Sequence, residues 1–179
     1  MIRTWTAVAA LALATVPAAA AAQEGPRLDC VVVSAGADMR AALGTAMAGD
    51  GDEASREALF KQFGSVVDQC AASQAIPEAS KSDYFDYGLA RISREWLLGA
   101  LAAAALDANV VDKALDFGLD KSNPDLSGEM SDEQIMKIVQ AFVDAGVNID
   151  AVDQKVWEKV GAYAAATSIY WNKRKKLPF

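Results

Sequence analysis

The sequence predicts an all-α protein, a single irregular (orthogonal) bundle of about six helices around an apolar central helix, held by one disulfide. Three observations support this fold class. Apolar residues recur at helical spacing in several segments that begin at capping residues and end at Gly or Pro. No two alternating segments flank a tight turn, as a β-hairpin would require. The run at 96–106 is apolar on every side, which is typical of a buried helix.

The first 22 residues have the pattern of a secretory signal peptide. Arg3 is followed by an uncharged apolar run at 6–16, by Pro17 and by small residues up to Ala22. The run is too short to cross a bilayer, which takes about 20 residues. We therefore predict cleavage after Ala22, a helical domain at 23–172 and a basic tail at 173–179, in a periplasmic or secreted protein. The alternative is an alanine-rich N-terminal helix of a cytosolic protein.

The composition excludes several classes of function. The chain has 24 acidic and 17 basic residues, a net charge of −7, and this charge argues against nucleic acid as a partner. No later apolar run is long enough to span a membrane. Because the chain has no histidine, Ser–His–Asp and Cys–His catalysis and most transition-metal sites are excluded. No glycine-rich phosphate-binding loop is present either. We therefore expect no enzymatic activity and no tightly bound cofactor.

The N-terminal third predicts two helices. Residues 23–33 are expected to form a short extended lead-in, and a first helix follows Ser34 or Asp38. The Gly–Asp–Gly turn at 49–51 ends it. Asp52 can cap a second helix, whose inward positions are Leu59, Phe63, Val66, Val67 and Cys70.

The two cysteines, Cys30 and Cys70, are predicted to form a disulfide between the lead-in and this second helix. An even cysteine count in an exported chain favours a structural bond. The alternative is a reactive thiol pair, but no Cys-x-x-Cys motif supports it.

The central segment predicts the longest helix. After the break at Pro77, Ser80 or Ser82 can cap a helix that extends through Leu106. Its first half is amphipathic, and its second half is expected to be buried on all sides. A short helix from Asn109 to Gly118 follows.

Two further helices complete the fold. Ser131 and Gln134 predict a capping box, and the inward stripe that follows it is Ile135, Ile138, Val139, Phe142 and Val143. Gly146 ends this helix, and Asp150 with Asp153 begins the last one.

The loop before the capping box resembles the twelve-residue calcium loop of EF-hand proteins. Oxygen-bearing side chains occupy the ligand positions, and Gly128 stands at the sixth position, where the sharp turn lies. The candidate calcium ligands are Asn123, Asp125, Ser127, Glu129, Ser131 and Gln134. Asn123 replaces the usual first aspartate and Gln134 the usual bidentate glutamate, so any calcium affinity would be low. The alternative is a polar turn followed by the capping box.

The C-terminus is a second candidate for binding. Lys173, Arg174, Lys175 and Lys176 could contact anionic lipid headgroups or an acidic partner. The alternative is that these cations compensate the dipole of the last helix.

Besides weak calcium binding through the loop at 123–134, three functions remain open from the sequence. The first is contact with an unknown protein or envelope component. The second is transport of a small apolar ligand between helices, with Trp96, Phe142, Trp157 and Tyr163 as its candidate lining. The third is a carboxylate hydrolase around Glu95, which forms a possible i, i+4 pair with Arg91 and would need a second acid across a cleft. We favour the first.

Overall fold

The computed structural model describes residues 25–49, 51–126 and 128–178. The predicted signal peptide at 1–22 lies outside these residues. The described residues form helices and no strand, so the all-α prediction is confirmed. The α-helices are α1 (Pro26–Ser34), α2 (Gly36–Met47), α3 (Glu53–Ser73), α4 (Lys81–Ala103), α5 (Asn109–Ala114), α6 (Asp132–Asp144) and α7 (Gln154–Lys176). Two short 3-10 turns, η1 (Glu78–Ser80) and η2 (Ile149–Ala151), precede α4 and α7.

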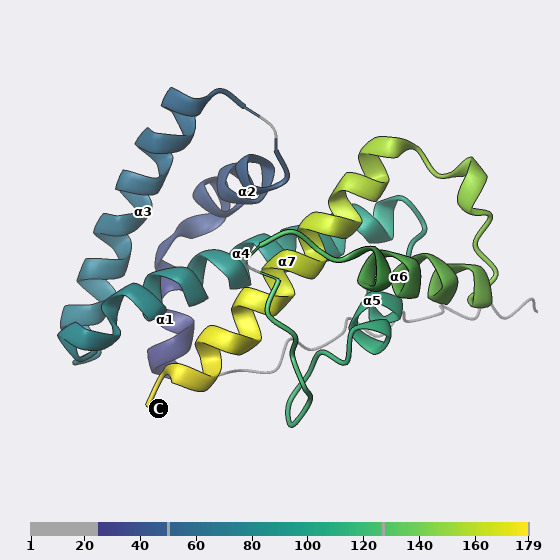
Figure 1. Ribbon diagram of the computed structural model, residues 1–179. Helices are drawn as coiled ribbons and strands as arrows, with labels where there is room; N and C mark the ends of the chain where they lie inside the picture. The colour runs from purple at the N-terminus through teal and green to yellow at the C-terminus, as the bar shows by residue number, and fades with distance from the viewer. Residues whose placement is uncertain (1–24, 50, 127, 179) are drawn as a thin grey trace, which may run out of the picture.

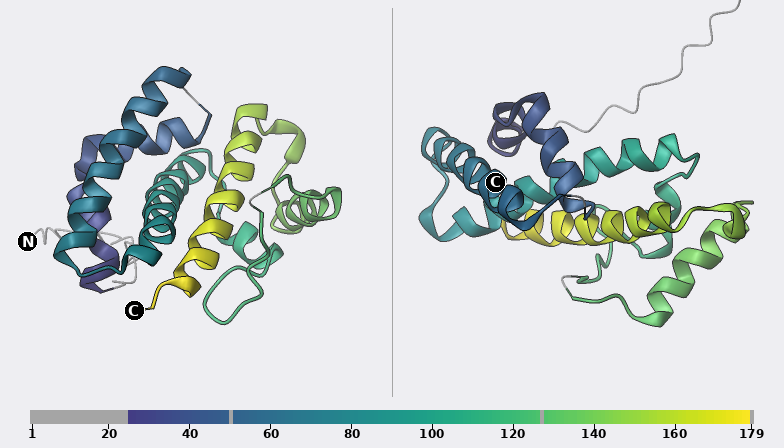
Figure 2. Two further views of the ribbon diagram at one scale, coloured as in Figure 1. Left: turned by 60° about the vertical axis from the view of Figure 1, so that its left-hand side comes forward. Right: turned by 90° about the horizontal axis from the view of Figure 1, so that it is seen from above.

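Helices α4 and α7 lie side by side and antiparallel through the middle of the molecule (Figures 1 and 2). Near one end of this helix pair, the rings of Tyr87 and Tyr170 stack with centroids 5.4 Å apart. At the same end Lys173 pairs with Asp83 and Asp86. The predicted central helix is therefore α4, but it forms the core of the fold together with α7.

The apolar core has two parts that share α4 and α7. One part lies where α1, α2 and α3 meet the first half of α4 and the end of α7. The other lies where α5 and α6 meet the second half of α4 and the first half of α7. Trp171 packs against both parts.

The second half of α4 is not buried on all sides, so that prediction was wrong. Leu97 and Leu101 are fully buried, whereas Gly99 and the alanines at 102–105 are exposed. Exposure of alanine costs little, because its side chain is a single methyl group. The absence of a polar face therefore did not require a partner on every side of the helix.

The predicted extended lead-in is instead helix α1. Pro26 stands at the first helical position, where its missing N–H group costs nothing. Val31 and Val32 are buried and Val33 is exposed, as expected for a helix rather than a strand. The predicted disulfide is confirmed: Cys30 and Cys70 join α1 to α3, with their Cα atoms 5.8 Å apart.

Two of the predicted helix caps are present, and a third lies three residues later than predicted, because Asp150 belongs to η2 and Asp153 caps α7. Asp52 accepts a hydrogen bond from the Ser55 N–H at the start of α3. Ser131 and Gln134 form the capping box of α6, and Asp153 caps α7. Ser80 precedes α4 but makes no side-chain cap.

Candidate functional site

Helix α6 is only partly covered by the rest of the described structure. Of its predicted inward stripe, Ile138 and Phe142 are buried, but Ile135 and Val143 are 42% and 43% exposed. The neighbouring Met136 is 61% exposed. The prediction that the whole stripe faces the core was therefore wrong for Ile135 and Val143. The physical reason is the position of α6 at the edge of the fold, where it packs mainly on α5.

A cavity of about 480 Å³ adjoins this uncovered face. It lies between α6, η2 and the first half of α7, and we call it the α6–α7 groove. Figure 1 shows the segment that contains η2 joining α6 to α7. The lining is mostly apolar and consists of Met130, Ile135, Ile138, Val139, Ile149, Asp150, Gln154, Trp157, Glu158, Val160 and Gly161.

Local contacts position α6 and α7 on the two sides of the groove. The rings of Phe142 on α6 and Trp157 on α7 pack edge to face, with centroids 5.6 Å apart. Helix α6 begins at the capping box and ends where Gly146 adopts a φ of 82°, which glycine allows without strain. The Val147 N–H then donates to the Phe142 carbonyl at 3.0 Å. This turn directs the chain into η2 and sets the position of α7 relative to α6.

The surroundings of the groove are acidic. Residues 129–158, which include α6, η2 and the start of α7, contain seven acidic and two basic residues. The carboxylates of Asp150 and Glu158 line the groove, and no lysine or arginine of the described residues does. Lys137 forms an exposed pair with Glu133 at 2.9 Å, and the segment keeps an excess of five acidic residues. The groove thus combines an apolar floor with a negative rim.

The residues of the calcium-like loop have other partners in the structure. The buried Asn123 side chain accepts a hydrogen bond from the Gly118 N–H and donates to the carbonyls of Gly118 and Lys121. Ser131 and Gln134 form the capping box, and Ser127 lies outside the described residues. Within the described ranges no three acidic, Cys or His side chains converge as a metal site would require. Calcium binding through Asp125 and Glu129 stays a prediction.

The same loop is attached to α7 by two polar side chains. Ser168 donates to the Pro124 carbonyl at 2.7 Å and accepts from the Leu126 N–H at 2.8 Å. Asn172 donates to the Asn123 carbonyl at 3.1 Å. These contacts hold the loop against α7.

The basic C-terminal cluster is partly engaged within the fold. Helix α7 extends through Lys176, so its last turn contains all four basic residues, and Leu177 is buried. Lys173 lies 2.8 Å from an Asp83 oxygen and 2.7 Å from an Asp86 oxygen. Its hydrogen bonds to these two carboxylates raise its pKa. Lys175 and Lys176 are exposed, so a lipid or partner contact by them stays a prediction.

The predicted Arg91–Glu95 pair is present, with Arg91 Nε and Glu95 Oε1 3.0 Å apart. Arg91 also contacts Asp29 of α1 at 2.7 Å and donates to the Leu28 carbonyl. Burial opposes the charge of Arg91, but Tyr87 and the two carboxylates keep its pKa above the ordinary value. The pair thus joins α1 to α4. Neither Arg91 nor Glu95 lines the α6–α7 groove, and neither lines a cavity between α2 and α3 or the cavity between α4 and α7.

A second polar cluster, which sequence reasoning missed, joins α4, α5 and α7. Arg94 Nη2 lies 3.1 Å from an Asp112 oxygen and donates to the Tyr163 hydroxyl. The Tyr163 hydroxyl donates in turn to Asp112 at 2.9 Å, and Arg94 Nε donates to Thr167. Burial raises the pKa of Asp112 against the opposing effect of Arg94. Each group has a partner within the cluster, so we assign it a structural role.

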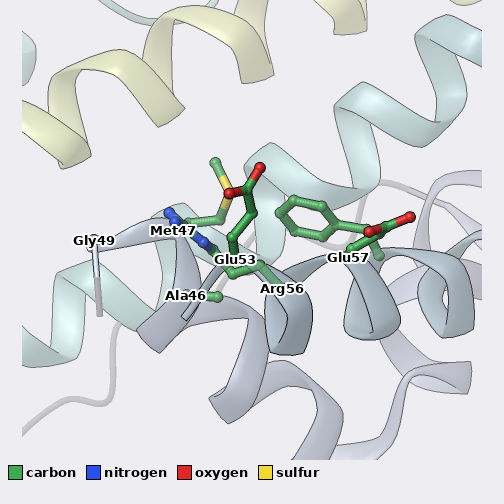
Figure 3. A pocket seen from close by; sticks show the side chains of 7 residues that line it. Ala46, Met47, Gly49, Glu53, Arg56 and Glu57 are labelled. Carbon is green, nitrogen blue, oxygen red and sulfur yellow. The ribbon is translucent and has the colours of Figure 1, made fainter. Parts of the chain in front are cut away.

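The other cavities indicate a particular kind of ligand less clearly than the α6–α7 groove does. One of about 560 Å³ lies between α2 and α3. Figure 3 shows the Arg56 and Glu53 side chains close to Met47 and the Glu57 carboxylate pointing away, so the walls of this cavity carry both signs of charge. Another, of about 520 Å³, lies on the other side of the same two helices.

The smallest of the four cavities measures about 320 Å³ and lies between α4 and α7, next to Met47 of α2. Among the four aromatic residues predicted to line a ligand site, Trp157 alone lines one of these four cavities. Phe142 and Tyr163 are fully buried in the core.

No helix of the described residues is both long enough and apolar enough to cross a membrane. Comparison of the chain with protein-family models, with curated proteins and with solved structures gave no match. Function is therefore inferred from the geometry of the chain itself.

Proposed function

We propose that this chain is an exported, non-enzymatic protein that acts by binding a protein partner across the α6–α7 groove. The observation that carries the proposal is the uncovered apolar face of α6, which continues directly into the groove. Contiguous exposed apolar surface of this kind is typical of binding sites. The disulfide between Cys30 and Cys70 supports export, because such bonds persist in oxidising compartments.

The extent of the apolar surface favours a macromolecule over a small ligand. A compact ligand inside the groove would leave Met136 and Val143 exposed, because neither lines the cavity. A partner segment lying along α6 would cover both side chains and the groove together. Apolar side chains removed from water in this way supply most of the free energy of protein association.

Photo-crosslinking in the cells that export the protein tests this proposal. A photoreactive phenylalanine analogue in place of Met136 should give a discrete protein adduct that is lost in Val143→Lys. The matched control is the same analogue in place of Leu119, which is 77% exposed and lies in a loop. All three sites are exposed, so the thermal midpoint should be unchanged. Equal adducts at 119 and 136, or none at either, would contradict the proposal.

A second candidate is the carriage of a small apolar ligand, which the volumes of about 480 and 320 Å³ favour. A Cβ atom at Gly161 would lie 3.7 Å from Met130 Cε, so a longer side chain would project into the groove. Native mass spectrometry of protein isolated without denaturation should then show a bound mass that Gly161→Leu removes. Detection of the bare chain alone would exclude this candidate.

A further inference from the structure

The apolar sector of α6 is wider than the surface that the fold covers. At about 100° per residue, the apolar side chains of α6 span about 160° of its circumference. Their order around the helix is Ile138, Phe142, Ile135, Val139, Val143 and Met136. The buried residues, Ile138 and Phe142, stand at one edge of this sector, and the exposed Val143 and Met136 stand at the other. One side of an apolar stripe is therefore open along the whole of α6.

The open side has the size of a short helix. Helix α6 has 13 residues, which corresponds to a length of about 20 Å. A partner helix of about three turns could place apolar side chains at i, i+4 and i+7 along Ile135, Val139 and Val143, as helix-in-groove complexes do. Met130 and Met136 border this path, and the flexible methionine side chain adapts to the shape of a partner.

The charge of the rim indicates the charge of the partner. Residues 129–158, which include the open stripe, contain seven acidic and two basic residues, and Asp150 and Glu158 line the groove itself. A second copy of this chain would bring the same acidic excess against the first in a two-fold contact, which is repulsive. Anionic lipid headgroups would be repelled for the same reason. A segment with lysine or arginine beside its apolar positions is attracted instead.

We propose that the occupant of the α6–α7 groove is a basic amphipathic helix of a partner protein. This inference rests on the proposed function and adds the chemistry of the partner to it. Apolar side chains of the helix contact Trp157, Ile135 and Val143, while its basic side chains lie next to Asp150 and Glu158.

Two designed peptides of about three turns test the inference. Both carry leucine at i, i+4 and i+7, and one has lysine and arginine at the flanking positions where the other has glutamate. Fluorescence polarisation of each labelled peptide with the mature, oxidised protein measures its affinity. The basic peptide should bind at least about tenfold more tightly at low salt, and this advantage should shrink as salt screens the rim.

Matched variants locate the binding. Asp150→Lys with Glu158→Lys should weaken the basic peptide about tenfold, whereas Glu57→Lys, an exposed acidic residue on α3 far from the groove, should not. Equal affinity for the two peptides, or no binding of the basic one up to millimolar concentration, overturns the inference and leaves the crosslinking test of the proposed function standing. Binding unaffected by Val143→Lys places the peptide elsewhere and overturns it too. A dimer seen by light scattering that Val143→Lys dissociates would show that a second copy covers the face.

Discussion

The close packing of α2 against α4 depends on Gly44, and the substitution Gly44→Ala tests this packing. A Cβ atom at Gly44 would lie 2.1 Å from Trp96 Cγ and 2.5 Å from Trp96 Cβ. Ordinary carbon contacts begin at about 3.5 Å, so the two helices must separate by about 1 Å or Trp96 must leave its place. Overpacking of this kind lowers the free energy of unfolding by about 1–3 kcal/mol, and the better helix propensity of alanine offsets about 1 kcal/mol of that loss. Because the first obstacle is the stem of a bulky indole, we expect a net loss of about 2 kcal/mol.

Gly99→Ala is the matched control on α4. Gly99 is exposed, and a Cβ atom there would meet nothing within 4 Å. The same substitution should therefore stabilise the protein by about 0.5–1 kcal/mol. Urea unfolding followed by circular dichroism, with the disulfide intact, measures both free energies. If Gly44→Ala is as stable as Gly99→Ala, Trp96 does not rest on Gly44, and the packing of α2 on α4 described here is refuted.

Three further outcomes are expected. Replacing Cys30 and Cys70 by alanine should lower the free energy of unfolding in urea by about 4 kcal/mol at most, because the disulfide joins residues separated by 40 positions. If the free energy does not fall, other contacts hold α1 in place. Burial raises the pKa of Tyr84 to about 12. The free energy of unfolding should therefore fall by up to about 2 kcal/mol between pH 10 and 12. In chemical unfolding, Tyr84→Phe should lack this part of the alkaline loss of stability. Calcium at several millimolar should leave the thermal midpoint unchanged, whereas a rise that Asp125→Ala abolishes would establish the EF-hand-like site.

The local features of the fold were predictable from the sequence. Asp52 and Ser131 cap helices where they were expected to, because a cap depends on residues two or three positions apart, whereas α7 is capped by Asp153 instead of Asp150. The Cys30–Cys70 pairing was also predictable, since two cysteines allow one intramolecular bond.

Helix α1 was the main local error, because its three consecutive valines fit a strand as well as a short buried helix. The helix prevails since Val31 packs against the site of Gly88 on α4, a contact that no local pattern contains.

The candidate site was predictable only in part. The apolar stripe of α6 and the presence of Trp157 were evident, but periodicity cannot say whether a partner element covers a face. The polar clusters around Arg91 and Arg94 were missed because Asp29 and Asp112 come from other helices.

The sequence by itself determined most of the helices, some of their caps and the disulfide, since each depends on spacing along the chain or on residue identity. Only the tertiary structure decided that α6 lies at an edge with Met136 and Val143 exposed, and that Trp157 forms a wall of a groove. Burial is a property of which elements meet in space, and one apolar stripe can face either a core or a partner.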